Sequence, residues 1–344
     1  MIAEADIAAC RALLKGGSRT FHAASLVLPR KVADPAMALY AFCRLADDAV
    51  DLGRDRRAAV ARLRRRLDLA YRGEPDQHPA DRAFTSVVQH FAIPRALPEA
   101  LLDGLAWDAE GRRYETLHDL TDYAARVAGS VGAMMTLVMG PRTPDVLARA
   151  CDLGVAMQFT NIARDVGEDA RAGRLYLPLQ WLRDARLDPD AWLAKPEFSP
   201  EIAAIVQRLL GAADDLYRRA TAGIPHLPLA CRPGMHAARV LYAEIGREVE
   251  RAGLDSVSQR AVVSSRRKLA VAARAVLAMH AAPSSRHALA SPALAETRFL
   301  IDAVAALPHR PARLPRPSAE ARVVWVLDLF MRLEQRDRLL RGPS

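Results

Sequence analysis

The sequence has few of the residues that would indicate a thiolate metal site, a secreted fold or a membrane span. Its four cysteines are far apart and form no CxxC pair, so we expect no zinc site and reduced thiols. The N-terminus lacks the basic start and apolar run of a signal peptide, and no run of roughly 18 apolar residues occurs. These absences predict a cytoplasmic protein without a transmembrane helix.

Aromatic residues are also scarce, at 6%, and only four of the 49 basic residues are lysine. Ala, Leu, Arg and Val dominate instead, and 51% of the residues are hydrophobic, which favours a large helical core. The net charge of +9 suits an anionic partner such as a phosphate or an acidic membrane surface. Because the basic residues are scattered and match no nucleic-acid-binding motif, nucleic acid is not an expected partner.

Nearly every segment has helical rather than strand periodicity. Asp34 and Pro35 predict the cap and first turn of a helix that runs through Asp51 and ends near Gly53. Several prolines at 183–200 predict a loop with short helical turns. Further helices are predicted at 56–71, 80–91, 94–110, 117–139, 144–169, 200–222, 227–252, 258–280 and 293–307.

This pattern predicts one all-α domain over residues 1–306. A Pro/Arg-rich connector at 307–318 is expected to be stiff and exposed. Residues 319–344 form an amphipathic helical pattern with arginines opposite an apolar face. That pattern is typical of a helix that lies on a membrane surface, and packing on the domain explains it equally well.

The most informative stretch is QFTNIARDVGEDARAGRLYLP, residues 158–178. At spacings of three, four and four it carries Gln158, Asn161, Asp165 and Asp169. Side chains so spaced share one face of a helix, and carboxylate and amide oxygens suit Mg²⁺. The stretch CRLADDAVD repeats the idea, with Asp47 and Asp51 four residues apart. A lone Asp pair is usually a solvated helix face, but two such motifs inside apolar helices predict a clamp for divalent ions and a diphosphate leaving group.

Two further features lie close to these motifs. Arg44, Arg164 and Arg174 stand beside the acids, where they would bind phosphate bidentately or pair with the local aspartates. The stretch YAARVAGSVGAMMTLV, residues 123–138, places small residues inside an apolar helix. Close helix packing and a groove for a long apolar ligand both explain it.

Taken together, these stretches resemble the squalene/phytoene synthase family. The segments from Tyr123 and at 153–178 are similar to its two signatures, 43–51 is similar to its first aspartate-rich motif, and the similarity extends over 18–282. The resemblance implies an all-α, single-domain isoprenoid-synthase (class I) fold with a central cavity. It also implies head-to-head condensation of two geranylgeranyl diphosphates, through a cyclopropylcarbinyl diphosphate, to phytoene in carotenoid biosynthesis.

The resemblance also implies roles for individual residues. The expected metal-site residues are Asp47, Asp51, Asn161, Asp165 and Asp169. The expected substrate-binding residues are Ser18, Tyr40, Arg44, Gln158, Asn161, Arg164, Arg174, Tyr176, Tyr242 and Arg266. Tyr123 is expected to act in catalysis with the four aspartates, Asp108 to orient an arginine, and Asp48 to be secondary. The implied ion is Mg²⁺, with Mn²⁺ as an alternative, and no NADPH is expected.

Other functions stay open at this point. Within the enzymes they are a squalene- or dehydrosqualene-type synthase using farnesyl diphosphate, a chain-elongating prenyltransferase and a terpene cyclase. Outside them, a non-catalytic helical assembly factor is the alternative, although all five metal-site residues are present. Expected partners are the inner face of the cell membrane, bound peripherally, and a downstream carotenoid enzyme.

Overall fold

The computed structural model describes residues 2–17, 28–51, 55–264, 266–268, 270–271 and 289–307. Helices joined by turns make up these ranges, which contain no strand, so the predicted all-α class is confirmed. The α-helices are α1 (Glu4–Gly17), α3 (Arg30–Asp51), α4 (Arg56–Arg72), α5 (Pro79–His90), α6 (Ala96–Ala109), α7 (Leu117–Ala124), α8 (Ser130–Met139), α9 (Pro144–Arg171), α10 (Leu179–Asp184), α11 (Pro189–Ala194), α12 (Pro200–Thr221), α13 (Arg232–Arg251) and α16 (Arg298–Ala305). A π-helical turn, η1 (Ala125–Gly129), and two 3-10 turns, η2 (Ile224–His226) and η3 (Ala295–Thr297), complete the set.

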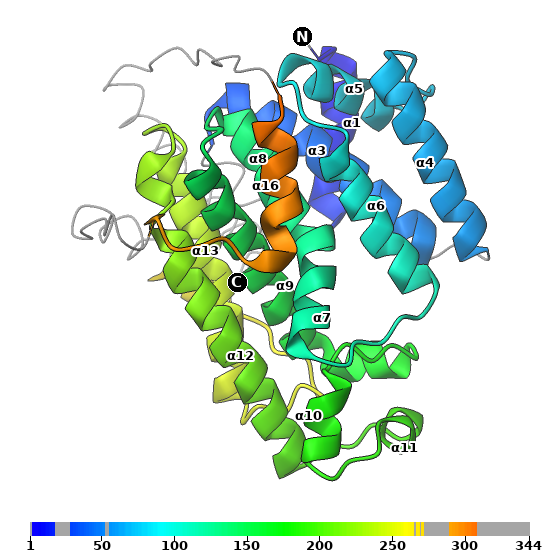
Figure 1. Ribbon diagram of the computed structural model, residues 1–344, viewed down its shortest axis with the longest axis vertical. Helices are drawn as coiled ribbons and strands as arrows, with labels where there is room; N and C mark the ends of the chain where they lie inside the picture. The colour runs from blue at the N-terminus through cyan, green and yellow to red at the C-terminus, as the bar shows by residue number, and fades with distance from the viewer. Residues whose placement is uncertain are drawn as a thin grey trace, which may run out of the picture.

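Helix α9 lies in the interior of the bundle, where it packs against α7, α8, α12, α13 and α16 (Figure 1). Its start and end follow the sequence: Thr143 precedes Pro144 at the first helical turn, and Arg171 lies in the last turn. With 28 residues, the helix is about 42 Å long. It can therefore line a cavity along much of the molecule's length.

Several predicted helices differ from the structure. The helices predicted at 227–252 and 293–307 begin only at Arg232 and Arg298. Helix α3 begins at Arg30 rather than at Pro35, because Val32 and Ala33 already donate to the Pro29 carbonyl, each at 2.8 Å. Pro35 therefore lies inside the helix, where its missing N–H costs one backbone hydrogen bond. The continuous helix predicted at 117–139 contains the π-helical turn η1, and residues 258–264 form a turn and an extended segment rather than a helix start.

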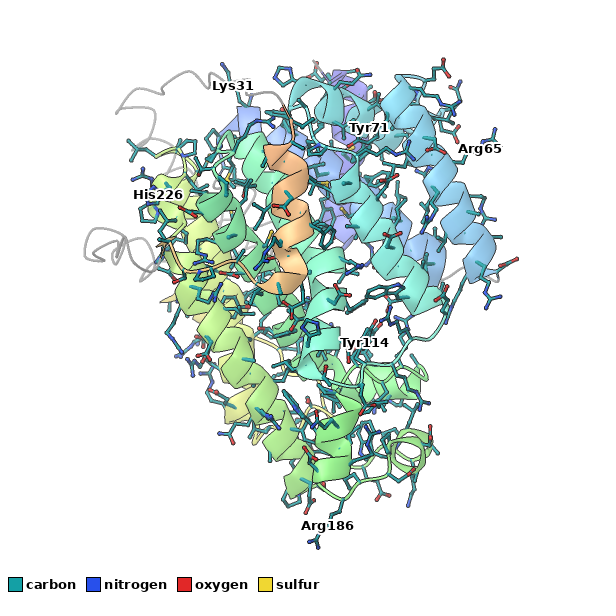
Figure 2. All side chains as sticks on the ribbon, viewed as in Figure 1. Lys31, Arg65, Tyr71, Tyr114, Arg186 and His226 are labelled. Atoms are coloured by element: carbon teal, nitrogen blue, oxygen red, sulfur yellow. The ribbon has the colours of Figure 1, made fainter. Side chains whose placement is uncertain are left out.

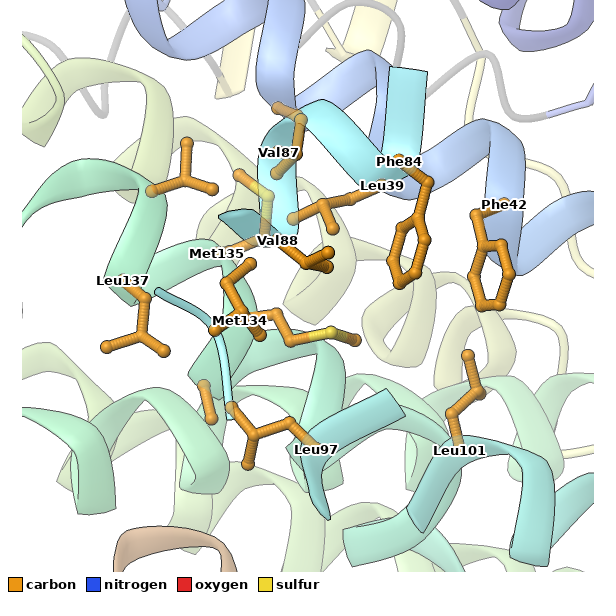
Figure 3. Close-up of a cluster of buried hydrophobic side chains, with 14 of the residues drawn as sticks. Leu39, Phe42, Phe84, Val87, Val88, Leu97, Leu101, Met134, Met135 and Leu137 are labelled. Atoms are coloured by element: carbon orange, nitrogen blue, oxygen red, sulfur yellow. The ribbon is translucent and has the colours of Figure 1, made fainter. Parts of the chain in front are cut away.

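Two apolar cores meet along α9. In the first, which involves α3, α5, α6 and α8, the Phe42 and Phe84 rings stack with their centroids 3.9 Å apart (Figure 3). The second gathers side chains of α10, α11 and α12, including Trp181 and Trp192. The first turns of α9 belong to the first core and its later turns to the second. Helix α9 is thus the wall that both halves of the protein share.

Glycines let α9 approach α8 and η1 backbone to backbone. A Cβ atom on Gly154 would lie 2.3 Å from the Ala128 carbonyl oxygen, and one on Gly132 would lie 2.4 Å from that of Ala150. Both distances are too short for any side chain, so close packing explains these glycines. The groove explanation also holds, because both glycines line the apolar cavity described below.

Charged side chains cover the outer surface. Arg65 on α4 and Arg186 after α10 point outward, whereas Tyr114 lies inside and is completely buried (Figure 2). No helix that the structure describes is both long and apolar enough to cross a membrane. The predicted connector and C-terminal helix lie outside the described residues, apart from Leu307.

Candidate active site

A polar cavity of about 630 Å³ lies between the C-terminal half of α3 and the C-terminal half of α9. Most of its lining comes from these two helices and from the segment that follows α9. The lining residues are Tyr40, Arg44, Asp47, Asp108, Tyr123, Gln158, Asn161, Ile162, Arg164, Asp165, Asp169, Arg174, Tyr176, Tyr242, Ile245 and Arg260. Acids from three separate helices, α3, α6 and α9, therefore face one space, together with four arginines.

The polar stripe of α9 faces this cavity as its spacing predicts. Its four members line the cavity and are only partly buried: Gln158, Asn161, Asp165 and Asp169. Apolar residues between them face the second core and are buried: Phe159, Ala163 and Val166. Helix α9 thus has a polar face toward the cavity and an apolar face toward the core. Packing of the apolar face fixes the orientation of the polar side chains.

Asp165 is held by two arginines. The Nε atoms of Arg164 and Arg260 each donate to Asp165 Oδ1 at 2.7 Å, and Arg260 also donates to Oδ2 at 3.3 Å. Burial alone would raise the pKa of Asp165, but the hydrogen bonds from Arg164 and Arg260 lower it below its usual value. Asp165 is therefore a stable carboxylate anion at neutral pH.

Asp169, one helical turn further along α9, is in the opposite situation. Burial raises its pKa to about 7, the negative charges of Asp165 and Glu168 add to this rise, and Arg174 opposes it. The positive charge of Arg174 therefore compensates the carboxylate form of Asp169 only in part. A cation bound between these carboxylates would supply the remaining positive charge.

Asp47 faces the cavity from α3. Arg44 Nη1 lies 3.4 Å from Asp47 Oδ2, and Arg44 Nη2 lies 2.6 Å from Asp48 Oδ1. Asp48 lines neither this cavity nor the apolar cavity beside it. Asp51 ends α3, but its side chain lies outside the described residues, as does all of Ser18.

Three tyrosines surround Asp108 at one end of the polar cavity. The Tyr123 hydroxyl donates to Asp108 Oδ2 at 2.8 Å, and the Tyr176 hydroxyl donates to Oδ1 at 2.7 Å. The rings of Tyr123 and Tyr176 stack with centroids 5.4 Å apart, and Tyr114 lies against both. Burial raises the pKa of both hydrogen-bonded tyrosines, so their hydroxyls stay protonated and donate.

A second, apolar cavity of about 240 Å³ continues from the polar one. Both cavities are lined by Tyr40, Gln158, Asn161 and Tyr242. From Asn161 the apolar cavity follows α9 back to Val146, a path of roughly 22 Å at the rise of an α-helix. No acidic side chain of the described residues lines it. The arrangement is a charged compartment opening into a long hydrocarbon compartment.

The oxygen donors of the polar cavity fit a hard divalent cation. Within the described ranges, no three Asp, Glu, His or Cys side chains converge closely enough to hold an ion by themselves. Mg²⁺ commonly keeps several waters and takes further oxygens from substrate phosphates, so one or two carboxylates from each wall are sufficient. Asp47 on α3 and the α9 stripe supply such carboxylates.

Comparison with known proteins identifies the family that shares this arrangement. The profile of the squalene/phytoene synthase family matches residues 14–268. The chain belongs to the squalene/phytoene synthase family. The phytoene synthase of Cereibacter sphaeroides is 51% identical over 360 residues, covering 98% of this chain and 96% of the relative. That of Rhodobacter capsulatus is 51% identical over 344 residues and covers 98% of each chain.

Solved structures of family members confirm the predicted isoprenoid-synthase helical fold. A dehydrosqualene synthase in complex with a ligand matches with a TM-score of 0.75 at 30% identity, over 81% of this chain and 98% of that one. A squalene synthase from Alicyclobacillus acidocaldarius matches with a TM-score of 0.67 at 24% identity, over 72% and 94%, and supports the fold alone. Prenyl diphosphates are the substrates of this family, and isoprenoid synthases generally use a divalent metal ion.

The predicted site residues whose side chains the structure describes line the two cavities, with the exception of Arg266. Arg266 is exposed and does not line either cavity, whereas Arg260 lines the polar cavity and pairs with Asp165. Sequence reasoning missed Arg260 because a single arginine carries little signal in so Arg-rich a chain. For Asp108, whose predicted role was to orient an arginine, the structure shows two tyrosine hydroxyls that donate to its carboxylate.

Proposed function

We propose that this enzyme, a prenyltransferase like its relatives, condenses two geranylgeranyl diphosphates head to head to phytoene in carotenoid biosynthesis. The observation that carries the proposal is the continuity of the two cavities. A polar compartment with carboxylates and arginines fits diphosphate, and the apolar compartment that it joins fits a long prenyl tail. Tyr40, Gln158, Asn161 and Tyr242 stand where the head and the tail of the substrate would meet.

The residues around the polar cavity would bind the diphosphate end through arginines and through metal ions held by the acids. Asp47, Asp51, Asn161, Asp165 and Asp169 would hold Mg²⁺, or Mn²⁺ in its place, and the bound ion neutralises the charge of the departing diphosphate. Arg44, Arg164, Arg174 and Arg260 line the same space and can each bind phosphate oxygens bidentately. A metal ion held by Asp165 would supply positive charge beside the diphosphate, and Arg164 and Arg260, which now bond Asp165, lie within the same cavity.

The chemistry then proceeds in two ionisations. In the first, one substrate loses diphosphate, and its allylic C1 is attacked by the C2–C3 double bond of the second substrate. Loss of a proton leaves a cyclopropylcarbinyl diphosphate. In the second, that compound loses its own diphosphate, the ring rearranges, and loss of another proton gives phytoene. Each released diphosphate can accept a proton. Because the last cation is discharged by loss of a proton and not by addition of hydride, no NADPH is required.

The protein's own groups protect the carbocations. An apolar cavity without acidic lining in its described part excludes water and offers no carboxylate that would trap a cation. The ring faces of Tyr123 and Tyr176 lie beside the polar cavity and can stabilise positive charge without reacting. The hydrogen bonds of both hydroxyls to Asp108 hold those rings in one orientation.

The test is product identification with the full chain. The enzyme is incubated with Mg²⁺ and either geranylgeranyl or farnesyl diphosphate, with and without NADPH, and the product mass is measured. We expect a forty-carbon hydrocarbon with the mass of phytoene from geranylgeranyl diphosphate, unaffected by NADPH. A thirty-carbon product from farnesyl diphosphate alone would instead favour the dehydrosqualene-type alternative, to which the structural match at 30% identity points. A cyclised product from a single substrate would contradict both.

The membrane and partner predictions rest on the sequence, because residues 308–344 lie outside the described ranges. The proposal is a cytoplasmic enzyme that binds the inner face of the cell membrane through residues 319–344 and passes phytoene to a downstream carotenoid enzyme. Deleting 319–344 should reduce liposome binding and leave detergent-assayed activity intact. Unchanged liposome binding would refute the membrane role of this helix.

A further inference from the structure

Gly167 lies on α9 between the two aspartates of the second acidic motif, where another part of the chain touches the helix backbone. Its N–H donates to the Ser256 carbonyl oxygen at 2.9 Å. A Cβ atom on Gly167 would lie 2.0 Å from the Val257 carbonyl oxygen and 2.7 Å from Val257 Cα. No side chain fits at these distances, so only glycine allows this contact.

The segment that touches Gly167 is a braced turn after α13. Gly253 and Leu254 have φ angles of +73° and +63°, which reverse the chain at the helix end. Oδ1 of Asp255 then accepts hydrogen bonds from the N–H groups of Val257, at 3.2 Å, and Ser258, at 2.8 Å. This Asx-type arrangement fixes the turn and directs its carbonyl groups toward α9.

A second contact ties the turn to the same helix. Nη1 of Arg171 donates to the Val257 carbonyl oxygen at 3.0 Å. The Val257 side chain is 2% exposed and belongs to the second core. The turn is therefore anchored to α9 through Gly167, through Arg171 and through buried apolar contact.

Three residues beyond Val257, the chain delivers Arg260 to the catalytic face of α9. Arg260 Nε lies 2.7 Å from Asp165 Oδ1 and 3.2 Å from Glu168 Oε2. These two acids flank Gly167 on the helix. The contact of Gly167 with Ser256 and Val257 and the contact of Arg260 with Asp165 therefore involve the same short segment, residues 256–260. A shift of the backbone at Val257 must also shift Arg260.

We propose that Gly167 is a positioning residue for the diphosphate site, acting through Arg260. By admitting the Ser256–Val257 backbone against α9, it sets where the Arg260 guanidinium meets the diphosphate oxygens. The inference rests on the proposed role of Arg260 in diphosphate binding, and the experiment separates the two. The glycine at position 167 thus allows close packing on α9 and also determines how far the Arg260 side chain extends into the site.

The experiment compares Gly167→Ala, Arg260→Gln and the double variant in the full-length protein. Inhibition by inorganic diphosphate at fixed Mg²⁺ is the binding measurement, and KM and kcat with geranylgeranyl diphosphate are measured beside it. Losing a charge-assisted hydrogen bond weakens binding by roughly tenfold or more, so we expect both single variants to raise the inhibition constant by about that factor. The double variant should be no worse than Arg260→Gln alone, because both changes remove the same contact.

Gly211→Ala is the matched control. Gly211 also lies within a long helix, α12, but a Cβ atom there would meet nothing within 4 Å. The inhibition constant of Gly211→Ala for inorganic diphosphate should equal that of the wild-type protein. Should Gly167→Ala not fold, as judged by circular dichroism, Arg171→Gln replaces it, because that change loosens the turn without adding a Cβ atom.

The outcomes distinguish the two ideas. If Arg260→Gln leaves diphosphate inhibition unchanged, the proposed role of Arg260 is wrong, and with it the inference. If Arg260→Gln weakens inhibition while neither Gly167→Ala nor Arg171→Gln does, Arg260 binds diphosphate and Gly167 does not position it. If the effects of Gly167→Ala and Arg260→Gln multiply in the double variant, Gly167 acts independently of Arg260, and the inference is overturned.

Discussion

The Tyr123 hydroxyl donates a hydrogen bond to Asp108 at 2.8 Å, which holds the Tyr123 ring in a fixed orientation beside the polar cavity. Burial raises the pKa of Tyr123 well above its ordinary value, so the hydroxyl is a donor and does not serve as a phenolate base at neutral pH. The part of Tyr123 that can act on a carbocation is therefore its ring face.

Replacing Tyr123 separates the ring from the hydroxyl. Tyr123→Phe keeps the ring, and Tyr176 still donates to Asp108, so we expect kcat to fall by no more than about threefold. Tyr123→Leu removes the ring face, and a desolvated cation–π interaction of about 2 kcal/mol corresponds to a roughly thirtyfold lower kcat. Single-turnover formation of product measures both. Equal losses in the two variants would assign the role to the hydroxyl instead.

Removing one acid from either wall tests the metal-binding proposal. Asp47→Ala and Asp165→Ala should abolish turnover at saturating Mg²⁺, because each takes a carboxylate from the polar cavity. Both side chains are near the surface of a cavity rather than in a packed core, so the circular dichroism spectrum should not change. The product mass and the circular dichroism spectrum are measured on the same protein samples.

Asp48→Ala is the control for these variants. Asp48 is the chain neighbour of Asp47 and pairs with Arg44, but it does not line the polar cavity. We expect it to keep most of its activity, with a modest rise in KM as Arg44 loses a partner. Retained activity in either Asp47→Ala or Asp165→Ala would refute the two-wall metal clamp.

The sequence was sufficient to predict the α9 stripe because helical geometry is local. Residues three and four positions apart must share a face, so Gln158, Asn161, Asp165 and Asp169 were placed correctly without any tertiary information. The start of α3 was predicted wrongly for a related reason. Proline usually marks a first turn, but hydrogen bonds to the Pro29 carbonyl form a helical turn before Pro35 is reached.

Contacts between residues that are far apart in the sequence could not be predicted from the sequence alone. Arg260 meets Asp165 across 95 positions, and Asp108 meets Tyr176 across 68, so nothing local indicates either pair. The position of Arg260 depends on a turn that can contact α9 only because residue 167 is glycine. In the sequence alone, that glycine indicates only a residue with low helix propensity. The family resemblance named most of the residues that line the polar cavity, and tertiary packing adds Arg260 to that lining.

An ion-pair cluster on α13 predicts a pH dependence of stability. Glu244 is 8% exposed, and its Oε1 lies 2.6 Å from Arg251 Nη2 and 2.8 Å from Arg267 Nε. Burial alone would raise the pKa of Glu244, but the hydrogen bonds from Arg267 and Arg251 lower it below the ordinary value. The stabilisation is therefore complete above the unfolded pKa of about 4.3 and is lost as the pH falls through the lower folded pKa.

Glu244→Gln removes this pH-dependent contribution. Its melting temperature should lie below that of the wild-type protein at pH 6, where the carboxylate is ionised. The gap in melting temperature should narrow at pH 3, which is below the unfolded pKa of about 4.3, because the stabilisation by the carboxylate declines there. The difference in melting temperature is measured at both pH values by thermal unfolding monitored with circular dichroism. A gap that is constant with pH would mean that the side chain contributes through packing and not through its charge.

The depth of the apolar cavity determines which prenyl tail fits, and Val146 marks the end furthest from Asn161 along α9. Val146→Phe fills that end, so it should lower kcat/KM for geranylgeranyl diphosphate by about tenfold or more while leaving farnesyl diphosphate less affected. Val146→Ala enlarges the same end and should not discriminate against the longer substrate. The ratio of kcat/KM for the two substrates is the measurement, because it cancels any general loss of folded enzyme. If Val146→Phe lowers both values equally, the tail does not reach Val146, and the cavity that selects chain length ends nearer to Asn161.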